Sequence, residues 1–377
     1  MATKWLTSLY KLQILLILAL AVAFMVIVRP VKASPPTPQP LPPTGDCYRD
    51  NVFYGAIPPR GEQSPVLVFV HGLGGLASDW WVNVPGLQVN DMYDQACEAG
   101  YRTAFVNLNV NPDALDCAVE RRPAKDMLYN GRVLSRQLDA ITQYYGVEQV
   151  DIVAHSKGGI DAQAAIVWWG AWRKVRRVFT LGSPHQGSLV ADLLWSPEGF
   201  WVSLILGERD DATFSLQTSS MRLFRTLTDV MPMDDGIRYY SGAGNFWNTP
   251  GTLYPLIGRW LQDQPEGGDN DGVVTVASTY LPGASTLFLE PWNHSEVYVG
   301  RNAFPYIHRI LLDQEPGQHS VYLPLVVSAV PEASLALAAS GGQIAIAQET
   351  SQSPQPLESG FILRGGPLPG KTTEQIP

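Results

Sequence analysis

One serine in the sequence has the neighbours and the position that an activated nucleophile requires. Ser156 follows an apolar run at residues 150–155 and precedes a stretch of helical character, and residues 154–159 read AHSKGG. A serine held on a sharp turn between a strand and a helix needs small residues two positions away on either side, which Ala154 and Gly158 supply. The chemistry would be attack by the serine hydroxyl on an electrophilic carbon. The alternative is an exposed turn serine, because five-residue patterns recur by chance.

A glycine turn lies upstream of this serine, directly after another apolar run. Residues 66–71 form the run and end at His71, and residues 71–75 read HGLGG. Glycines at such a place let backbone amides point at one spot, which a developing oxyanion requires. A glycine turn alone is more often structural than catalytic. Upstream of a serine turn, it indicates an oxyanion hole.

A serine nucleophile also needs an imidazole to take its proton and a carboxylate to orient that imidazole. Residues 269–274 read DNDGVV and residues 292–295 read WNHS. Among the six histidines, His294 alone follows a strand and a loop downstream of an acidic turn. The others lie in turns, in a helix or in the tail: His71, His155, His185, His308 and His319. Asp271 is the predicted partner and Asp269 its main competitor, whereas a surface-loop histidine is the alternative for His294.

The segments that must hold these residues alternate between strand and helix. The predicted strands are residues 66–71, 103–109, 150–155, 176–183, 237–242 and 285–290. Most are continuously apolar, as expected for strands of a parallel sheet that is covered on both faces. The predicted helices between them are residues 91–99, 128–145, 159–169 and 303–312. This alternation predicts an α/β fold with a mostly parallel, doubly wound sheet.

The order Ser156, Asp271, His294 along the chain is that of the α/β-hydrolases. Over residues 66–312 the chain resembles the secreted bacterial triacylglycerol lipases of that family. The motifs that carry the resemblance are HGLGG, VAHSKGG, LGSPHQGS at 181–188, YYSGAG at 239–244, NDGVV and NHSE. It implies an α/β-hydrolase fold in which Ser156 is the nucleophile, His294 the base and Asp271 the residue that orients the base.

The resemblance also implies that the backbone amides of Leu73 and Lys157 form the oxyanion hole. The chain departs from the family pattern at Ala154, where the first glycine of the serine turn is usual, a variation known in one branch of these lipases. Some such lipases hold a structural calcium ion between two aspartates, and the corresponding positions here are Asn248 and Glu296. One carboxylate is lost and the other is lengthened. We therefore expect no required cofactor, with a structural calcium ion as the alternative.

Large apolar residues crowd the segment between two predicted strands, at about residues 189–236. They include Leu189, Val190, Leu193, Leu194, Trp195, Phe200, Trp201, Val202, Leu204, Ile205 and Leu206. So many apolar groups near the site predict a lid that meets lipid, and a fixed cap with a core beneath it is the alternative.

The predicted function is a serine carboxylester hydrolase, lipase-like, that acts on lipid or ester substrates. An acyltransferase or a polyester depolymerase on the same fold is the alternative, because each would use the same triad. A non-catalytic, membrane-tethered binding protein is the third candidate function.

The two ends of the chain differ in composition from its centre. Residues 12–28 are apolar apart from Gln13 and follow two lysines, which predicts an export signal over residues 1–33. Left uncleaved, they would span roughly 26 Å and form a membrane anchor, so the body is secreted or tethered to the outer face of the membrane. Proline-rich residues 34–45 predict a linker, residues 46–316 the catalytic domain and residues 317–377 a partly disordered extension.

Charge and cysteine content exclude further classes of protein. The chain has 26 Lys and Arg against 35 Asp and Glu, a net charge of −9, which argues against a nucleic-acid partner. The three cysteines have no CxxC spacing, so zinc and iron–sulfur sites are not expected. Cys97 and Cys117 could pair, but Cys47 makes the count odd.

Overall fold

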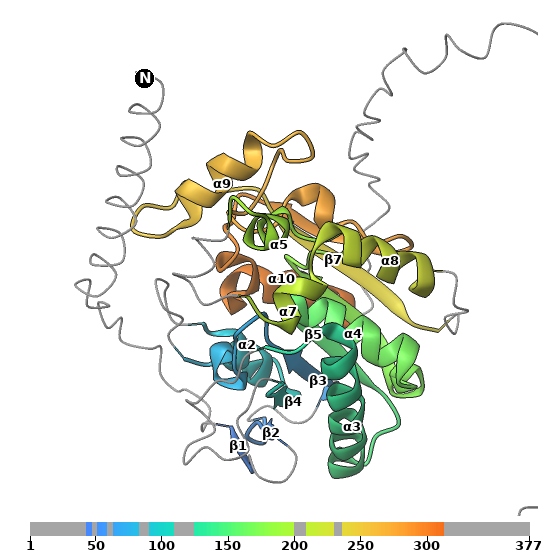
Figure 1. Ribbon diagram of the computed structural model, residues 1–377. Helices are drawn as coiled ribbons and strands as arrows, with labels where there is room; N and C mark the ends of the chain where they lie inside the picture. Colours follow the sequence, from blue (N-terminus) through green and yellow to red (C-terminus); the bar gives the residue numbers. More distant parts are fainter. Residues whose placement is uncertain are drawn as a thin grey trace, which may run out of the picture. The chain divides into compact units, whose positions relative to one another are not determined.

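The computed structural model describes residues 43–46, 51–58, 63–82, 90–108, 124–199, 209–229 and 236–312. Within these ranges an eight-stranded sheet has the order β1-β2-β4-β3-β5-β6-β7-β8 (Figure 1). Neighbouring strands from β4 to β8 are parallel, whereas β1 pairs with β2, and β2 with β4, in antiparallel fashion. The strands are β1 (Thr44–Asp46), β2 (Val52–Tyr54), β3 (Gln63–Val70), β4 (Tyr101–Val106), β5 (Val150–His155), β6 (Val175–Leu181), β7 (Arg238–Gly244) and β8 (Ser285–Glu290). The predicted mostly parallel α/β fold is confirmed.

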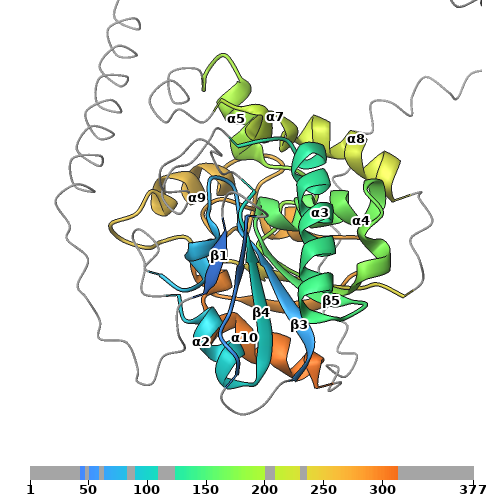
Figure 2. The same cartoon turned by 90° about the horizontal axis from the view of Figure 1, so that it is seen from below.

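Helices cover both faces of the sheet because successive side chains of each buried strand point to opposite faces. In β3, Val66 and Val68 belong to the core beneath α3 and α4, whereas Leu67 and Phe69 belong to the core beneath α2 and α10. Figure 2 shows these two pairs of helices on opposite sides of the sheet. The α-helices are α2 (Met92–Glu98), α3 (Met127–Tyr145), α4 (Lys157–Trp168), α5 (Leu189–Trp195), α7 (Asp211–Ser215), α8 (Thr218–Thr228), α9 (Tyr254–Gln262) and α10 (Gly300–Leu311). The short 3-10 helices are η1 (Ala77–Trp80), η2 (Ala171–Lys174), η3 (Val276–Thr279) and η4 (Glu296–Tyr298).

The sheet begins earlier than the sequence predicts. Thr44 and Gly45, assigned above to the linker, belong to β1 and pair with Tyr54 and Phe53 of β2. The prolines of this segment end at Pro43. Residues 44–46 each have a backbone N–H group that can donate to a neighbouring strand, so the sheet can begin directly after the last proline.

The insertion between β6 and β7 carries α5, α7 and α8, and polar contacts join these helices to one another and to α4. Asp192 of α5 accepts hydrogen bonds from the amide of Thr218 at 2.9 Å and from its hydroxyl at 2.7 Å. Arg225 of α8 is buried and donates to Gln163 of α4 at 2.5 Å. The first two bonds join α5 to α8 and the third joins α8 to α4, whereas residues 200–208, with Trp201 and Leu204 of the predicted lid, lie outside the described residues.

Several predictions concern segments that lie outside the described ranges. These are the export signal or anchor, most of the linker, the C-terminal extension, Cys47 and Cys117. Of the helices that the described ranges contain, none has both the length and the hydropathy needed to cross a bilayer.

Candidate active site

Ser156 occupies a strained turn between β5 and α4. Its backbone angles are φ 52° and ψ −128°, in a region that residues other than glycine rarely adopt. A Cβ on Gly158 would lie 2.5 Å from the carbonyl oxygen of His71, so only glycine fits beneath the turn. The amide of Ser156 donates to the carbonyl oxygen of Leu181 at 2.9 Å. The turn therefore holds the Ser156 hydroxyl at the carboxyl end of the parallel strands.

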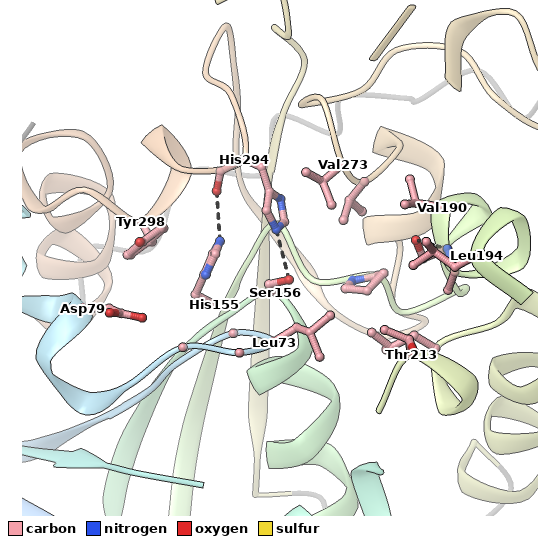
Figure 3. A pocket seen from close by; sticks show the side chains of 18 residues that line it. Leu73, Asp79, His155, Ser156, Val190, Leu194, Thr213, Val273, His294 and Tyr298 are labelled. Atoms are coloured by element: carbon pink, nitrogen blue, oxygen red, sulfur yellow. Dashed lines mark hydrogen bonds between the residues drawn. The ribbon is translucent and has the colours of Figure 1, made fainter. Parts of the chain in front are cut away.

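The structure brings Ser156, His294 and Asp271 into one hydrogen-bonded chain. The Oγ atom of Ser156 lies 3.0 Å from Nε2 of His294 (Figure 3), and Nδ1 of His294 lies 2.7 Å from Oδ2 of Asp271. A hydrogen on Nδ1 donates to the carboxylate, which leaves Nε2 as the acceptor of the serine proton. Ser156 and His294 are each 8% exposed and Asp271 is 1% exposed, so the chain of hydrogen bonds is shielded from water.

Asp271, and not Asp269, contacts the imidazole. The Oδ1 atom of Asp271 accepts from the amides of Val273 at 2.9 Å and Val274 at 2.7 Å, so both carboxylate oxygens have partners. The amide of His294 also donates to the carbonyl oxygen of Asp271 at 2.8 Å. Asp269 is exposed to solvent.

Two of the histidines that the sequence places in a turn and in a helix have partners away from this site. Nε2 of His185 lies 3.1 Å from the hydroxyl of Thr180, and burial lowers the pKa of His185 to about 3. Nδ1 of His308 lies 3.2 Å from the hydroxyl of Tyr101. His319 lies outside the described residues.

The glycine turn after β3 lies directly against the serine turn. A Cβ on Gly72 would lie 3.0 Å from Cβ of Ser156. His71 holds the turn in place, because its Nδ1 hydrogen donates to the carbonyl oxygen of Gly72 at 2.8 Å and its Nε2 accepts from the amide of Leu108 at 3.0 Å. Figure 3 shows Leu73 beside Ser156, and both residues line the same cavity.

Lys157 contributes a backbone amide to the same region and a buried charge beneath it. As the first residue of α4 it has an amide without an intrahelical partner. Its ammonium lies 2.5 Å from Oδ1 of Asp161, whose Oδ2 accepts from Asn130 at 3.0 Å. Burial raises the pKa of Asp161, and the charge of Lys157 opposes that shift. Sequence reasoning missed this ion pair, although a lysine and an aspartate four residues apart in an apolar helix are its signal.

His155 contacts the backbone of His294, which sequence reasoning also missed. Its Nε2 hydrogen donates to the carbonyl oxygen of His294 at 2.9 Å, and its ring stacks on Tyr298 with centroids 4.0 Å apart. Desolvation, and then the charge of His294, lower the pKa of His155 well below its usual value, so this imidazole is neutral at pH 7. His155 thereby ties the strand that carries Ser156 to the backbone of His294. No sequence pattern distinguishes this role from that of a turn histidine.

A cavity of about 320 Å³ opens onto Ser156 and His294. Asp79 and Tyr298 lie on one side of Ser156 in Figure 3. The residues on the other side in Figure 3 come from the insertion and from the loop of Asp271, and they include Val190, Leu194, Thr213 and Val273. Leu216 of the insertion also lines the cavity. The insertion therefore forms one wall of the cavity, and most of that wall is apolar.

The two positions considered for calcium do not form a two-carboxylate site. Asn248 is exposed, and Oε2 of Glu296 accepts the amide of Asn293 at 3.0 Å. Across the described ranges, no three side chains of His, Cys, Asp or Glu gather in a way that could hold a metal ion.

Comparisons with known proteins agree with this architecture. Residues 60–194 match the family model described as a PGAP1-like alpha/beta domain. The mature form of the lipase BlEst2 from Bacillus licheniformis is 38% identical, with a TM-score of 0.59, and the match covers 69% of this chain and 97% of that one. The propeptide form of the same lipase is also 38% identical, with a TM-score of 0.60, over 69% of this chain and 53% of that one.

Proposed function

This chain belongs to the α/β-hydrolase family of lipases and esterases, and on that premise we propose that it hydrolyses carboxylic esters through an acyl-enzyme on Ser156. The observation that carries the proposal is the chain of hydrogen bonds from Ser156 through His294 to Asp271, at 3.0 and 2.7 Å. A hydroxyl in this arrangement loses its proton as it attacks, which an isolated serine cannot do efficiently near neutral pH.

The reaction would proceed in two similar halves. Ser156 attacks the ester carbonyl while Nε2 of His294 takes its proton, and Asp271 stabilises the imidazolium that results. The amides of Leu73 and Lys157 would receive the oxyanion. His294 then protonates the departing alcohol, which leaves an acyl group on Ser156. Water, activated by the same imidazole, releases the acid.

We propose esters with an apolar acyl group as the substrates, on two grounds. The insertion places Val190 and Leu194 on one side of Ser156, where an acyl chain would find apolar contacts. In addition, the 38% identical solved structure is that of a lipase. We also propose that the insertion contacts the lipid surface when the ester is part of one.

Activity and labelling of Ser156→Ala test the proposal directly. The variant should hydrolyse p-nitrophenyl butyrate at less than a thousandth of the wild-type rate, since the attacking atom is gone. A fluorophosphonate probe should label the wild type once and leave this variant unlabelled. Ser219→Ala, on the exposed face of α8, is the matched control and should behave as wild type. Labelling of the Ser156 variant would refute the assignment.

A profile of acyl-chain length tests the substrate class. Rates with the acetate, butyrate, octanoate and palmitate esters of p-nitrophenol should increase beyond the acetate, because longer chains bury more apolar surface against the insertion. A profile that falls steadily from the acetate would favour a small-ester hydrolase. Transfer of the acyl group to an added alcohol in preference to water would favour the acyltransferase.

We also propose that the protein is exported, supported by the apolar residues 12–28 with two lysines before them. N-terminal sequencing of the protein from the culture medium tests this. A start at Ser34 would support cleavage, whereas an intact N-terminus in the membrane fraction would support the anchor. Recovery of the intact chain in the cytoplasm would contradict both.

A further inference from the structure

The proposed acid and base lie on separate loops, and a tyrosine at the start of α9 contacts both. Asp271 follows α9 in the chain, whereas His294 follows β8. Tyr254 is the first residue of α9, and its hydroxyl forms a hydrogen bond with Oγ of Ser295. Since Ser295 directly follows His294, this bond reaches the loop of the base.

The ring of the same tyrosine packs against the loop of the acid. Gly272 directly follows Asp271 and has a φ of +95°. A Cβ on Gly272 would lie 2.7 Å from Cβ of Tyr254 and 3.0 Å from its Cδ1, so the ring lies on bare backbone. Tyr254 therefore touches the residue after the acid and the residue after the base.

One further hydrogen bond joins the segment before Tyr254 to the loop of the base, and a second stabilises that loop. Asn293 donates to the hydroxyl of Thr249 at 3.0 Å, and its own Oδ1 accepts from the amide of Ser295 at 3.0 Å. Burial raises the pKa of Tyr254 to about 12. The phenol is thus neutral in any ordinary assay buffer, and its proton is available to the bond with Ser295.

We propose that Tyr254 is a positioning residue that fixes the loop of His294 against the loop of Asp271 through Ser295. This inference rests on the proposed function, because it gives Asp271 and His294 their roles. The two loops are already joined by the bond from Nδ1 of His294 and by the backbone bond from His294 to Asp271. Tyr254 adds a third link from outside the triad, which limits rotation of the loop that carries the imidazole.

The position of Tyr254 predicts which kinetic constant it affects. Tyr254 is not among the residues that line the cavity, so removal of its hydroxyl should leave substrate binding unchanged. Loss of the bond to Ser295 should misalign His294, and small misalignments of a catalytic group reduce turnover strongly. Both Tyr254→Phe and Ser295→Ala should therefore lower kcat about tenfold and leave KM within twofold of wild type.

The experiment measures kcat and KM with p-nitrophenyl butyrate, the rate of fluorophosphonate labelling and the melting temperature. The variants are Tyr254→Phe, Ser295→Ala and the double variant, with Ser295→Thr to restore a hydroxyl. Tyr306→Phe is the matched control, because its phenol donates to Glu290 at 2.6 Å outside the cavity and should be dispensable for turnover.

A double variant no slower than either single variant would support the pair, since residues that act through one bond are not additive. Recovery of kcat in Ser295→Thr would support it further. Multiplied losses in the double variant, a kcat of Tyr254→Phe within twofold of wild type, or an equal loss in Tyr306→Phe would overturn the inference. A wild type that hydrolyses no ester would instead overturn the proposed function, before any variant is compared.

Discussion

Replacing Asp271 by asparagine changes one oxygen to an NH2 group, and the structure determines where that group must lie. Oδ1 of Asp271 accepts from the amides of Val273 and Val274, whereas Oδ2 faces Nδ1 of His294. Asparagine has a single accepting oxygen. It must stay with the two backbone amides, because an NH2 group there would face two donors. The new NH2 group is therefore directed at His294.

This orientation gives His294 the wrong tautomer. Nδ1 must then accept a hydrogen bond, so the proton moves to Nε2, which can no longer take the proton of Ser156. The charge that stabilises the imidazolium is lost as well. Together these losses should lower kcat about 10³- to 10⁴-fold. At 1.36 kcal/mol for each factor of ten, this corresponds to about 4 to 5.5 kcal/mol in the barrier.

The assay compares Asp271→Asn with Asp269→Asn, which removes the same charge from an exposed residue two positions away. Turnover of p-nitrophenyl butyrate should fall by three to four orders of magnitude in the first variant and by less than twofold in the second. The melting temperatures of the two variants should stay close to that of the wild type, because both substitutions keep the size and shape of the side chain. A loss below tenfold in Asp271→Asn, or the reverse ranking of the two variants, would refute the reasoning.

Three further predictions concern stability, metal and lipid. Asp161→Ala should lower the free energy of unfolding by about 3 to 5 kcal/mol, because it leaves the ammonium of Lys157 buried and unpaired. Denaturant titration measures this free energy, and a loss below about 1 kcal/mol would contradict the prediction. EDTA should hardly change the melting temperature, and a large drop that calcium reverses would show a calcium site after all. If the insertion opens at lipid, opening it in water would expose several hundred Å² of apolar surface at a cost of about 25 cal/mol per Å², so it should stay closed there. A lipid surface removes this cost, so the rate with tributyrin should rise sharply above its solubility limit. Trp201→Ser with Leu204→Ser should flatten that rise and spare a soluble acetate ester, whereas smooth saturation in the wild type would indicate a fixed cap.

The central strands could be predicted because their burial is visible in the sequence. Strands β5 and β8 have the predicted bounds, and β3, β4, β6 and β7 differ from prediction by a few residues at their ends. A strand covered on both faces must be apolar at nearly every position, and such a run is easily recognised. The three residues of the hydrogen-bonded chain could be predicted for a related reason. Ser156 follows β5 and His294 follows β8, so both side chains lie at the carboxyl edge of the sheet, whereas Asp271 follows α9 and is predicted from the acidic turn at residues 269–274.

Other features could not be predicted because they depend on contacts between distant segments. The helices α5, α7 and α8 are short, and their places are fixed by pairs such as Asp192 with Thr218 and Arg225 with Gln163. Neither residue of such a pair reveals its partner in the sequence. The same holds for His155, whose bond to the backbone of His294 spans 139 positions.

The positive φ of Ser156, the proposed nucleophile, lowers the stability of the fold at this position. A residue with a side chain in such a sparsely populated region costs about 1 to 3 kcal/mol, a sizeable share of the roughly 5 to 15 kcal/mol by which domains are stable. Glycine adopts these angles readily, so Ser156→Gly should melt at a higher temperature than the wild type while losing activity. A chain used only to bind a partner would thus be more robust with glycine at position 156. Selection for catalysis would explain why serine is kept at a position where it destabilises the fold. The presence of serine there therefore argues against a purely binding role.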